Sequence, residues 1–134
     1  MQIVWFKRDL RLVDHAPLTM ASDSGPILPV YVLEPDLWKQ PDLSLRQYAF
    51  LRECIDDLAL GLRDHGQKLV IKIGDCIQIF SELTEKYVVD GIWTHQETWN
   101  GWTYARDKRF RRWVKEKGIP LPLVTLLTPG TSNK

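Results

Sequence analysis

The sequence is poor in the residues that most often form cross-links and metal sites. Its 134 residues include two cysteines, Cys54 and Cys76, whose spacing fits no metal-binding pair. The three histidines, His15, His65 and His95, are scattered and lack metal-ligand spacing. We therefore expect no metal site and two free thiols, which is the usual state of cysteines in the reducing cytoplasm.

Further absences narrow the range of functions. The sequence contains neither G-x-G-x-x-G nor G-x-x-x-x-G-K-[ST], so the common phosphate-cradling loops are missing. No Ser-His-Asp or Cys-His arrangement can be assembled, and we predict no catalytic residue. No apolar run approaches the roughly 20 residues that cross a bilayer, which argues against a membrane partner. The net charge of +1 gives no overall attraction to nucleic acid.

Short apolar segments rich in β-branched residues alternate with segments of helical periodicity. Strands are predicted at residues 3–6, 27–33, 69–73, 92–94 and 121–127. The helices between them are predicted to be capped by Asp14, Ser44, Asp75 and Asn100. Such alternation is typical of parallel strands joined by helical crossovers. The predicted fold class is therefore α/β: a single domain with a Rossmann-like, doubly wound, five-stranded parallel sheet over residues 1–128, followed by a flexible tail at 129–134.

Two long blocks of the sequence resemble one known family. Residues 5–14, WFKRDLRLVD, resemble the N-terminal signature of DNA photolyases and cryptochromes, in which a strand is followed by an aromatic residue, Arg-Asp-Leu-Arg and a nearby Asp. Residues 95–107, HQETWNGWTYARD, are similar to the loop and helix that follow the fourth strand in one bacterial branch of the family. The order of elements up to Ile119 fits as well. The chain thus resembles the N-terminal α/β domain of a photolyase or cryptochrome.

The resemblance implies a division of labour between two domains. In the family, the α/β domain of many members holds an antenna chromophore, whereas FAD and the DNA lesion bind to a helical domain. Residues 120–134 do not resemble that continuation, so we expect the FAD-binding helical domain to be absent here and the chain alone to be inactive as a lyase. In full-length relatives the implied function is light-driven DNA repair or blue-light sensing.

The same resemblance implies the partners. They are the helical FAD-binding domain and, only through that domain, damaged DNA. The surface that the helical domain covers in full-length relatives should leave an apolar patch on this chain, which predicts self-association.

A doubly wound sheet binds ligands where the strand order reverses, outside the carboxyl ends of the strands. With the order 3-2-1-4-5, this crevice lies between the first and fourth strands. The residues predicted to bind a cofactor there are Phe6, Lys7, Arg8 and Asp9 after the first strand, Leu33 and Glu34 at the end of the second, and Glu97, Trp99, Asn100 and Trp102 after the fourth. Aromatic walls with a few charges suit a flat heterocycle. The resemblance implies a folate, a deazaflavin or a flavin, and the sequence neither chooses among them nor requires that any of them binds.

Some of these residues have a structural alternative. Arg8 and Asp9, together with Arg11 and Asp14, could instead form an ion-pair network that fixes the turn and the surface facing the helical domain. Trp5 and Trp93 lie within predicted strands and are expected in the core rather than in a ligand site.

The predicted helix over residues 106–117 is strongly basic. It carries seven basic residues against two acidic ones, Asp107 and Glu116. Two explanations stay open, namely a solvated outer face or a surface that binds nucleic acid or another protein.

For the chain as a whole, an alternative is a nucleotide-binding protein of the adenine-nucleotide α-hydrolase-like class, although the absent glycine-rich loop weighs against it.

Overall fold

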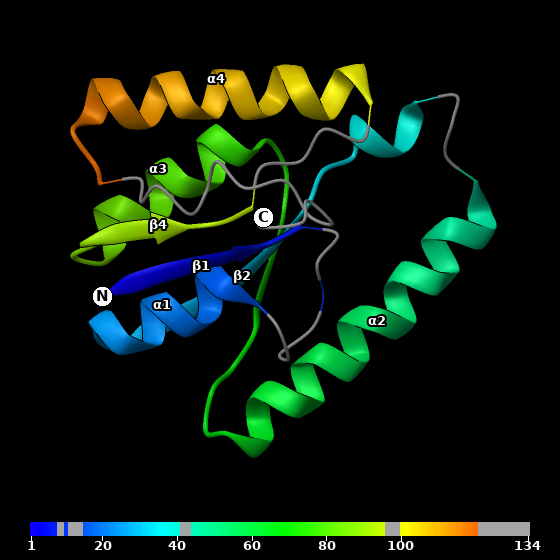
Figure 1. Cartoon of the computed structure of the whole chain (residues 1–134). Coiled ribbons are helices and arrows are strands. Elements are labelled where there is room, and N and C mark those ends of the chain that lie inside the picture. Colours follow the sequence, from blue (N-terminus) through cyan, green and yellow to red (C-terminus); the bar gives the residue numbers. More distant parts are fainter. Residues whose placement is uncertain (8–9, 11–14, 41–43, 96–99, 121–134) are drawn as a thin grey trace, which may run out of the picture.

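The computed structural model describes residues 1–7, 10, 15–40, 44–95 and 100–120, and it contains a parallel sheet flanked by helices (Figure 1). Within this part of the chain, the strands are β1 (Gln2–Phe6), β2 (Ile27–Leu33), β3 (Val70–Ile73) and β4 (Gly91–Trp93). The helices are α1 (Ala16–Ser24), a short 3₁₀ helix (Leu37–Lys39), α2 (Leu45–Asp64), α3 (Cys76–Lys86) and α4 (Gly101–Lys117). The predicted alternation of strands and helices is confirmed.

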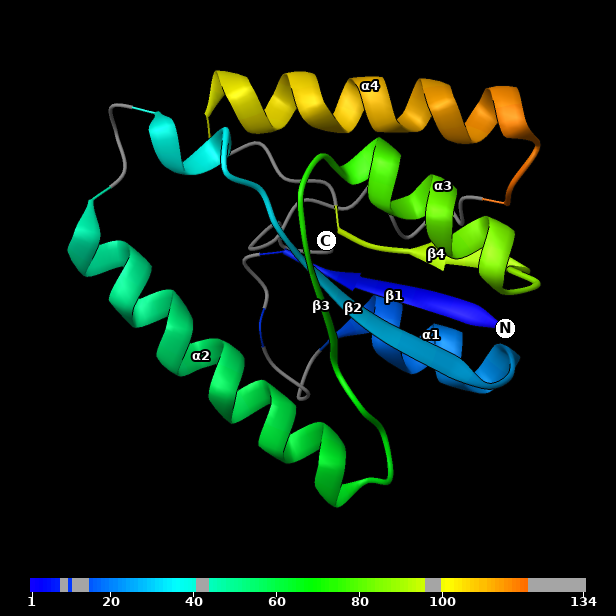
Figure 2. The same ribbon diagram turned by 180° about the vertical axis from the view of Figure 1, so that it is seen from behind.

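The strands are parallel and lie in the order β3-β2-β1-β4, with β3 at one edge (Figure 2). The strand order therefore reverses at β1, as the sequence predicts. The predicted fifth strand at 121–127 and the tail at 129–134 lie outside the described residues. The Ile92 N–H donates to the Pro120 carbonyl oxygen at 3.1 Å, so the chain already runs beside β4 at Pro120.

Local sequence explains where the helices begin. The predicted cap of α2 is confirmed, because the Ser44 hydroxyl accepts from the Gln47 N–H and the Gln47 side chain accepts from the Ser44 N–H. The predicted cap of α1 is wrong. Asp14 lies outside the described residues, and the N-cap is His15, whose Nδ1 accepts from the Leu18 N–H at 3.0 Å. Because the backbone of His15 is extended, its ring nitrogen can accept the capping hydrogen bond that was predicted for the Asp14 carboxylate.

The core lies on both faces of the sheet. Ile3 and Trp5 of β1 pack against α3 and α4, whereas Val4 and Phe6 pack against α1 and α2. All five residues of β1 are buried, as expected for a strand covered on both sides. Trp5 is a core residue, as predicted. Trp93 is only partly buried, and its Nε1 donates to the Gln2 side chain at 2.7 Å.

Helix α2 packs on the sheet mainly through its C-terminal half, and its N-terminal half diverges from the strands (Figure 2). Leu58 and Leu62 are buried, whereas Leu45 and Phe50 are 87% and 66% exposed. This divergence opens a space beside the carboxyl ends of β1 and β2, and that space holds the candidate site.

Candidate functional site

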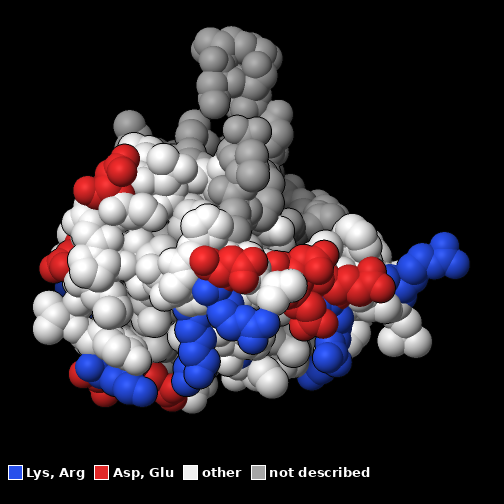
Figure 3. All heavy atoms as spheres, turned by 90° about the horizontal axis from the view of Figure 1, so that it is seen from below, with Lys and Arg blue, Asp and Glu red and all other residues white. Residues whose placement is uncertain are grey.

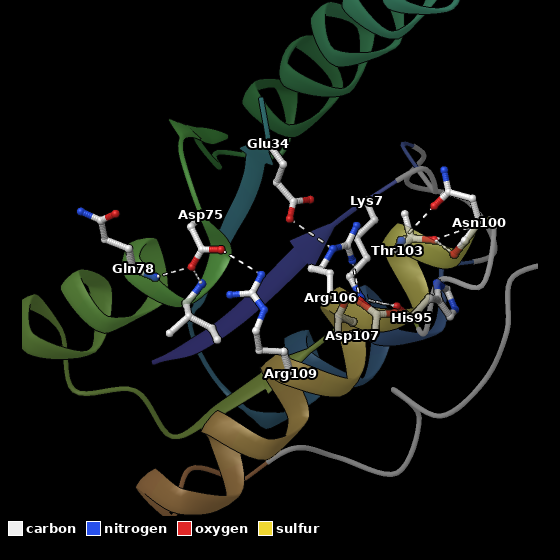
Figure 4. Close-up of polar contacts among 12 residues, drawn as sticks. Lys7, Glu34, Asp75, Gln78, His95, Asn100, Thr103, Arg106, Asp107 and Arg109 are labelled. Atoms are coloured by element: carbon white, nitrogen blue, oxygen red, sulfur yellow. Dashed lines mark hydrogen bonds and ion pairs between the residues drawn. The ribbon is translucent and has the colours of Figure 1, made fainter. Parts of the chain in front are cut away.

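Four charged side chains meet at the carboxyl ends of β1 and β2 (Figure 4). Lys7 follows β1, Glu34 follows β2, and Arg106 and Asp107 come from the second turn of α4. Their side chains are at most 6% exposed. The Lys7 Nζ lies 3.1 Å from the Asp107 Oδ1 and donates to the His95 carbonyl oxygen at 2.7 Å.

Arg106 links the two carboxylates of this network. Its Nη1 donates to the Asp107 Oδ1, and its Nε lies 3.2 Å from the Glu34 Oε2. Among the described residues, the network contains two cations and two anions, and their mutual pairing offsets the large cost of removing four ionised groups from water.

The indole of Trp5 lies against both cations of the network. The Lys7 Nζ is 4.3 Å from the ring centroid and the Arg106 Cζ is 5.1 Å from it. The same guanidinium lies 5.6 Å from the Trp102 ring. The negative faces of these rings attract the cations, so a core residue of β1 also helps to position the charged groups.

The start of α4 is held by a reciprocal cap. The Asn100 Oδ1 accepts from the Thr103 N–H at 2.9 Å, and the Thr103 Oγ1 accepts from the Asn100 N–H at 3.0 Å. Thr103 is fully buried. Residues three and four positions along a helix share its face, so the cap that buries Thr103 also directs Arg106 and Asp107 into the network.

A cavity of about 410 Å³ lies between the N-terminal half of α2 and the ends of β1 and β2. Lys7, Glu34 and Arg106 supply its charged wall. The other lining residues are mostly apolar or aromatic: Trp5, Leu10, Tyr31, Val32, Leu37, Trp38, Phe50, Leu51 and Cys54, together with the charged Arg46 and the polar Gln47 of α2. The arrangement is a mainly apolar slot with the buried charged groups at one side and Arg46 on the α2 side.

The indole of Trp38, which lines the cavity, carries a buried donor without a hydrogen-bond partner among the described residues. The Trp38 Nε1 is buried, and within the described part of the chain no acceptor lies within hydrogen-bonding reach of it. A buried donor without an acceptor costs about 1–3 kcal/mol. An acceptor atom on a molecule in the cavity would remove this cost.

A smaller hollow of about 150 Å³ shares Glu34 with the cavity, and Asp75 and Trp102 also line it. The Asp75 carboxylate caps α3, because its Oδ2 accepts from the Ile77 N–H at 3.1 Å and the Gln78 N–H at 3.3 Å (Figure 4). Its Oδ1 lies 2.9 Å from a guanidinium nitrogen of Arg109 in α4. Burial raises the pKa of Asp75, but these hydrogen bonds and the nearby positive charge outweigh burial and leave the pKa lowered.

The structure places the predicted cofactor-binding residues in several different environments. Lys7 and Glu34 line the cavity, Trp102 lines the smaller hollow, and Asn100 caps α4. Phe6 is fully buried in the core cluster beside α1 and α2 and does not line the cavity. Leu33 packs against that same cluster, and Arg8, Asp9, Glu97 and Trp99 lie outside the described residues.

The cavity lies on the α2 side of β1 and β2, away from the reversal between β1 and β4. Near that reversal are the buried imidazoles of His15 and His95, whose ring centroids are 5.0 Å apart. Sequence reasoning missed Trp38 and Phe50, since nothing local indicates that α2 diverges. Arg106 could have been identified, because it lies one helical turn beyond the capping pair.

Comparison with known proteins identifies the family. The family model described as DNA photolyase matches residues 2–131 of the 134-residue chain. The chain belongs to the DNA photolyase family. This membership confirms the resemblance found in the sequence and favours it over the adenine-nucleotide α-hydrolase-like alternative.

Individual relatives agree with the family model. The chain is 35% identical over 103 residues to a chloroplastic/mitochondrial cryptochrome DASH of Arabidopsis thaliana, a match that covers 72% of this chain and 18% of that protein. It is 30% identical over 119 residues to a deoxyribodipyrimidine photo-lyase of Agrobacterium fabrum, covering 87% of this chain and 24% of that one. The chain thus spans about a fifth of the length of these curated relatives.

Solved structures confirm the fold of the photolyase N-terminal domain. A bacterial class III photolyase from Agrobacterium tumefaciens superposes with a TM-score of 0.78 at 28% identity, covering 90% of this chain and 24% of that one. An archaeal photolyase from Sulfolobus tokodaii, described as holding two FAD molecules with the implication of a novel light-harvesting cofactor, has the same TM-score and identity and covers 90% and 28%.

The described residues offer neither a membrane-spanning helix nor a metal-binding cluster. None of the described helices combines the length and apolarity that a membrane crossing needs. Within the same ranges, no three His, Cys, Asp or Glu side chains converge in a way that could hold a metal ion.

Proposed function

We propose that this chain acts as the antenna and scaffold domain of a photolyase-type flavoprotein, and that the cavity beside α2 holds a flat heterocyclic chromophore. The observation that carries the proposal is the cavity itself, a mainly apolar slot of about 410 Å³ with the buried charged groups at one side. Its volume lies in the range of roughly 300–1,000 Å³ that is usual for small-molecule sites.

The lining residues fit such a group. Leu37 and Phe50 offer apolar surface for a planar ring, and the unpartnered Trp38 Nε1 would donate to a ring carbonyl. Arg46 would pair with a phosphate outside the ring system, and Lys7 would face its polar edge. A bound chromophore of this kind supplies light absorption and passes the excitation energy to a catalytic flavin.

Among a folate, a deazaflavin and a flavin, we propose a flavin. The support is the Sulfolobus tokodaii photolyase, which is described as holding two FAD molecules and which superposes on 90% of this chain.

Lyase activity in this proposal belongs to a helical FAD-binding domain, which is the partner we propose for this chain, and damaged DNA is reached through that domain. Both cysteines are free thiols, which supports the proposal that the protein works in the reducing cytoplasm.

Titration of the purified chain with FMN, FAD and a reduced folate, followed by absorbance and tryptophan fluorescence, tests the proposal. We expect saturable flavin binding. The Trp38→Phe variant should bind about 2- to 12-fold more weakly, since a hydrogen bond contributes about 0.5–1.5 kcal/mol. The matched Trp93→Phe variant, which loses the hydrogen bond from the Trp93 Nε1 to Gln2 outside the cavity, should bind like the native chain. Absence of binding to any of these compounds, or equal losses in both variants, would overturn the proposal.

A further inference from the structure

The charge of the chain is concentrated on one helix. Helix α4 carries seven basic and two acidic residues, a net charge of +5, whereas the whole chain has a net charge of +1. The residues outside α4 therefore have a combined net charge of −4. The face opposite α4, seen from below in Figure 3, instead shows acidic and basic side chains side by side. A weak overall charge thus hides a strongly basic surface.

The basic residues of α4 lie on the face that points away from the sheet. The buried face of the helix consists of Thr103, Arg106, Asp107, Phe110, Trp113 and Val114. The opposite side of the helix carries a stripe of residues at the spacing i, i+4, i+7, i+8 and i+11. These are residues 104, 108, 111, 112 and 115. Lys108, Arg112 and Lys115 are exposed, Arg111 is partly buried, and Tyr104 is 47% exposed.

The cations of this stripe form no ion pair within the described part of the chain. Within the described residues, Arg106 and Arg109 of α4 form ion pairs with carboxylates, and no such pair involves Lys108, Arg111, Arg112 or Lys115. Tyr104 lies beside the stripe, with the Lys108 Nζ 5.4 Å from its ring centroid. Four cations along one helix face produce a local positive potential that attracts a polyanion.

We propose that the exposed stripe of α4, formed by Tyr104, Lys108, Arg111, Arg112 and Lys115, binds the phosphate backbone of nucleic acid. At 1.5 Å per residue the stripe is about 16 Å long. One strand of duplex DNA presents a phosphate about every 3.4 Å along its axis, so a stripe of this length faces four or five phosphates. The number of cations matches the number of charges that they would meet.

The chemistry of the stripe favours nucleic acid over a lipid surface. Helices that bind membranes insert an apolar face between the lipids, but Phe110, Trp113 and Val114 of α4 are buried in the domain core. The stripe also contains two arginines, whose planar guanidinium groups can bind phosphate oxygens in pairs. None of the stripe residues lines the cavity beside α2.

Fluorescence anisotropy with a labelled short DNA duplex at several salt concentrations tests the proposal. Four phosphate contacts predict a slope of log affinity against log salt of about −3.6. The triple variant Arg111→Gln, Arg112→Gln, Lys115→Gln should lower this slope to about −1, because each lost contact removes about one unit. Its affinity at low salt should fall at least about tenfold.

Matched variants separate local from general effects. The control triple Arg52→Gln, Arg63→Gln, Lys68→Gln removes the same charge from exposed positions in and after α2 and should bind DNA like the native chain. The charge-preserving pair Arg111→Lys, Arg112→Lys should retain binding because the positive charges remain, and an unchanged urea midpoint of the α4 triple would show that its loss of binding is not unfolding. Flavin titration of the α4 triple should be unchanged, so this proposal and the antenna proposal fail independently.

Three results would overturn the proposal. The native chain could fail to bind duplex DNA at low salt, or both triple variants could lose affinity equally. Phosphatidylserine vesicles or polyglutamate could also bind as tightly as DNA, which would show that the stripe recognises negative charge without preference for a nucleic-acid backbone.

Discussion

The substitution Asp107→Asn removes one charge from the buried network and leaves its shape nearly unchanged. In the native chain, Lys7 and Arg106 share the Asp107 carboxylate, and Glu34 pairs with Arg106. After the substitution, Lys7 and Arg106 lose a shared carboxylate, and within the described part of the chain these two buried cations face the single carboxylate of Glu34. Side chains that are 2–6% exposed leave almost no access for water. Breaking a buried ion pair from one side costs about 3–5 kcal/mol. This is a large part of the roughly 5–15 kcal/mol that stabilises a typical domain.

Urea unfolding monitored by tryptophan fluorescence measures this loss. With a slope of about 2 kcal/mol per molar urea, the midpoint should fall by about 1.5–2.5 M. Asp90→Asn is the matched control, because it makes the same chemical change in a surface pair. The Asp90 side chain is 61% exposed and lies 2.6 Å from the amino group of Met1. Exposed pairs contribute about 0–1 kcal/mol, so the control should shift the midpoint little.

The double variant Lys7→Met, Asp107→Asn tests whether charge balance is the cause. It leaves Arg106 with Glu34 and restores equal numbers of buried positive and negative charges. We expect it to be more stable than the sum of the two single losses predicts, by at least about 1 kcal/mol. The reasoning is refuted if Asp107→Asn is no more destabilising than Asp90→Asn, or if the two single losses are additive in the double variant.

Three other predictions follow from burial and exposure. Burial, together with the Glu34 carboxylate, raises the pKa of Cys76 to about 12. The thiol of the unfolded chain ionises near pH 8.5. The free energy of unfolding should therefore fall as the pH rises from about 9 to about 12, because only the unfolded state gains from ionisation in this range. Denaturation at stepped pH should show a shallower alkaline decline in Cys76→Ala, and an identical decline would contradict the prediction. The lowered pKa of Asp75 stabilises the fold above the ordinary carboxyl value near 3.9, and this contribution is lost as the pH falls through the lower folded pKa. Asp75→Ala also removes the cap of α3, and urea unfolding at neutral pH should show a loss of stability of about 0.5–2 kcal/mol. This difference between the variant and the native chain should shrink at low pH. A difference that does not depend on pH would contradict the assigned ionisation. Ile71 and Ile73 are 50% and 66% exposed on the edge strand β3. Sedimentation velocity should therefore detect self-association of the native chain, and the double variant Ile71→Thr, Ile73→Thr should reduce it. A native chain that stays monomeric at high concentration would exclude this self-association.

Much of the architecture could be predicted because its causes are local. Apolar β-branched runs predicted β1 to β4, and the Ser44 and Asn100 capping residues predicted where α2 and α4 begin. The alternation of these elements then predicted a parallel sheet whose order reverses at β1. The cap of α1 was predicted wrongly, since a histidine ring nitrogen can accept the same hydrogen bond as a carboxylate.

The site was less predictable, because it depends on residues that are distant in the sequence. Lys7 and Glu34 were placed correctly at the carboxyl ends of their strands, and both line the cavity. Trp38, Phe50 and Arg106 were not foreseen. Their positions depend on how far α2 stands from the sheet and on how α4 lies across it, and neither distance is encoded in a local pattern.

Local patterns were sufficient to predict the elements, their parallel arrangement, the family and the basic character of the last helix, because these follow from periodicity, capping and residue type. The packing of the whole chain was needed to show that four charged side chains from three elements pair with one another and that α2 diverges to leave a cavity. It also shows that Lys108, Arg111, Arg112 and Lys115 form no ion pair within the described residues. Such outcomes depend on the packing distance and rotation of whole helices, which many weak contacts across the molecule set together.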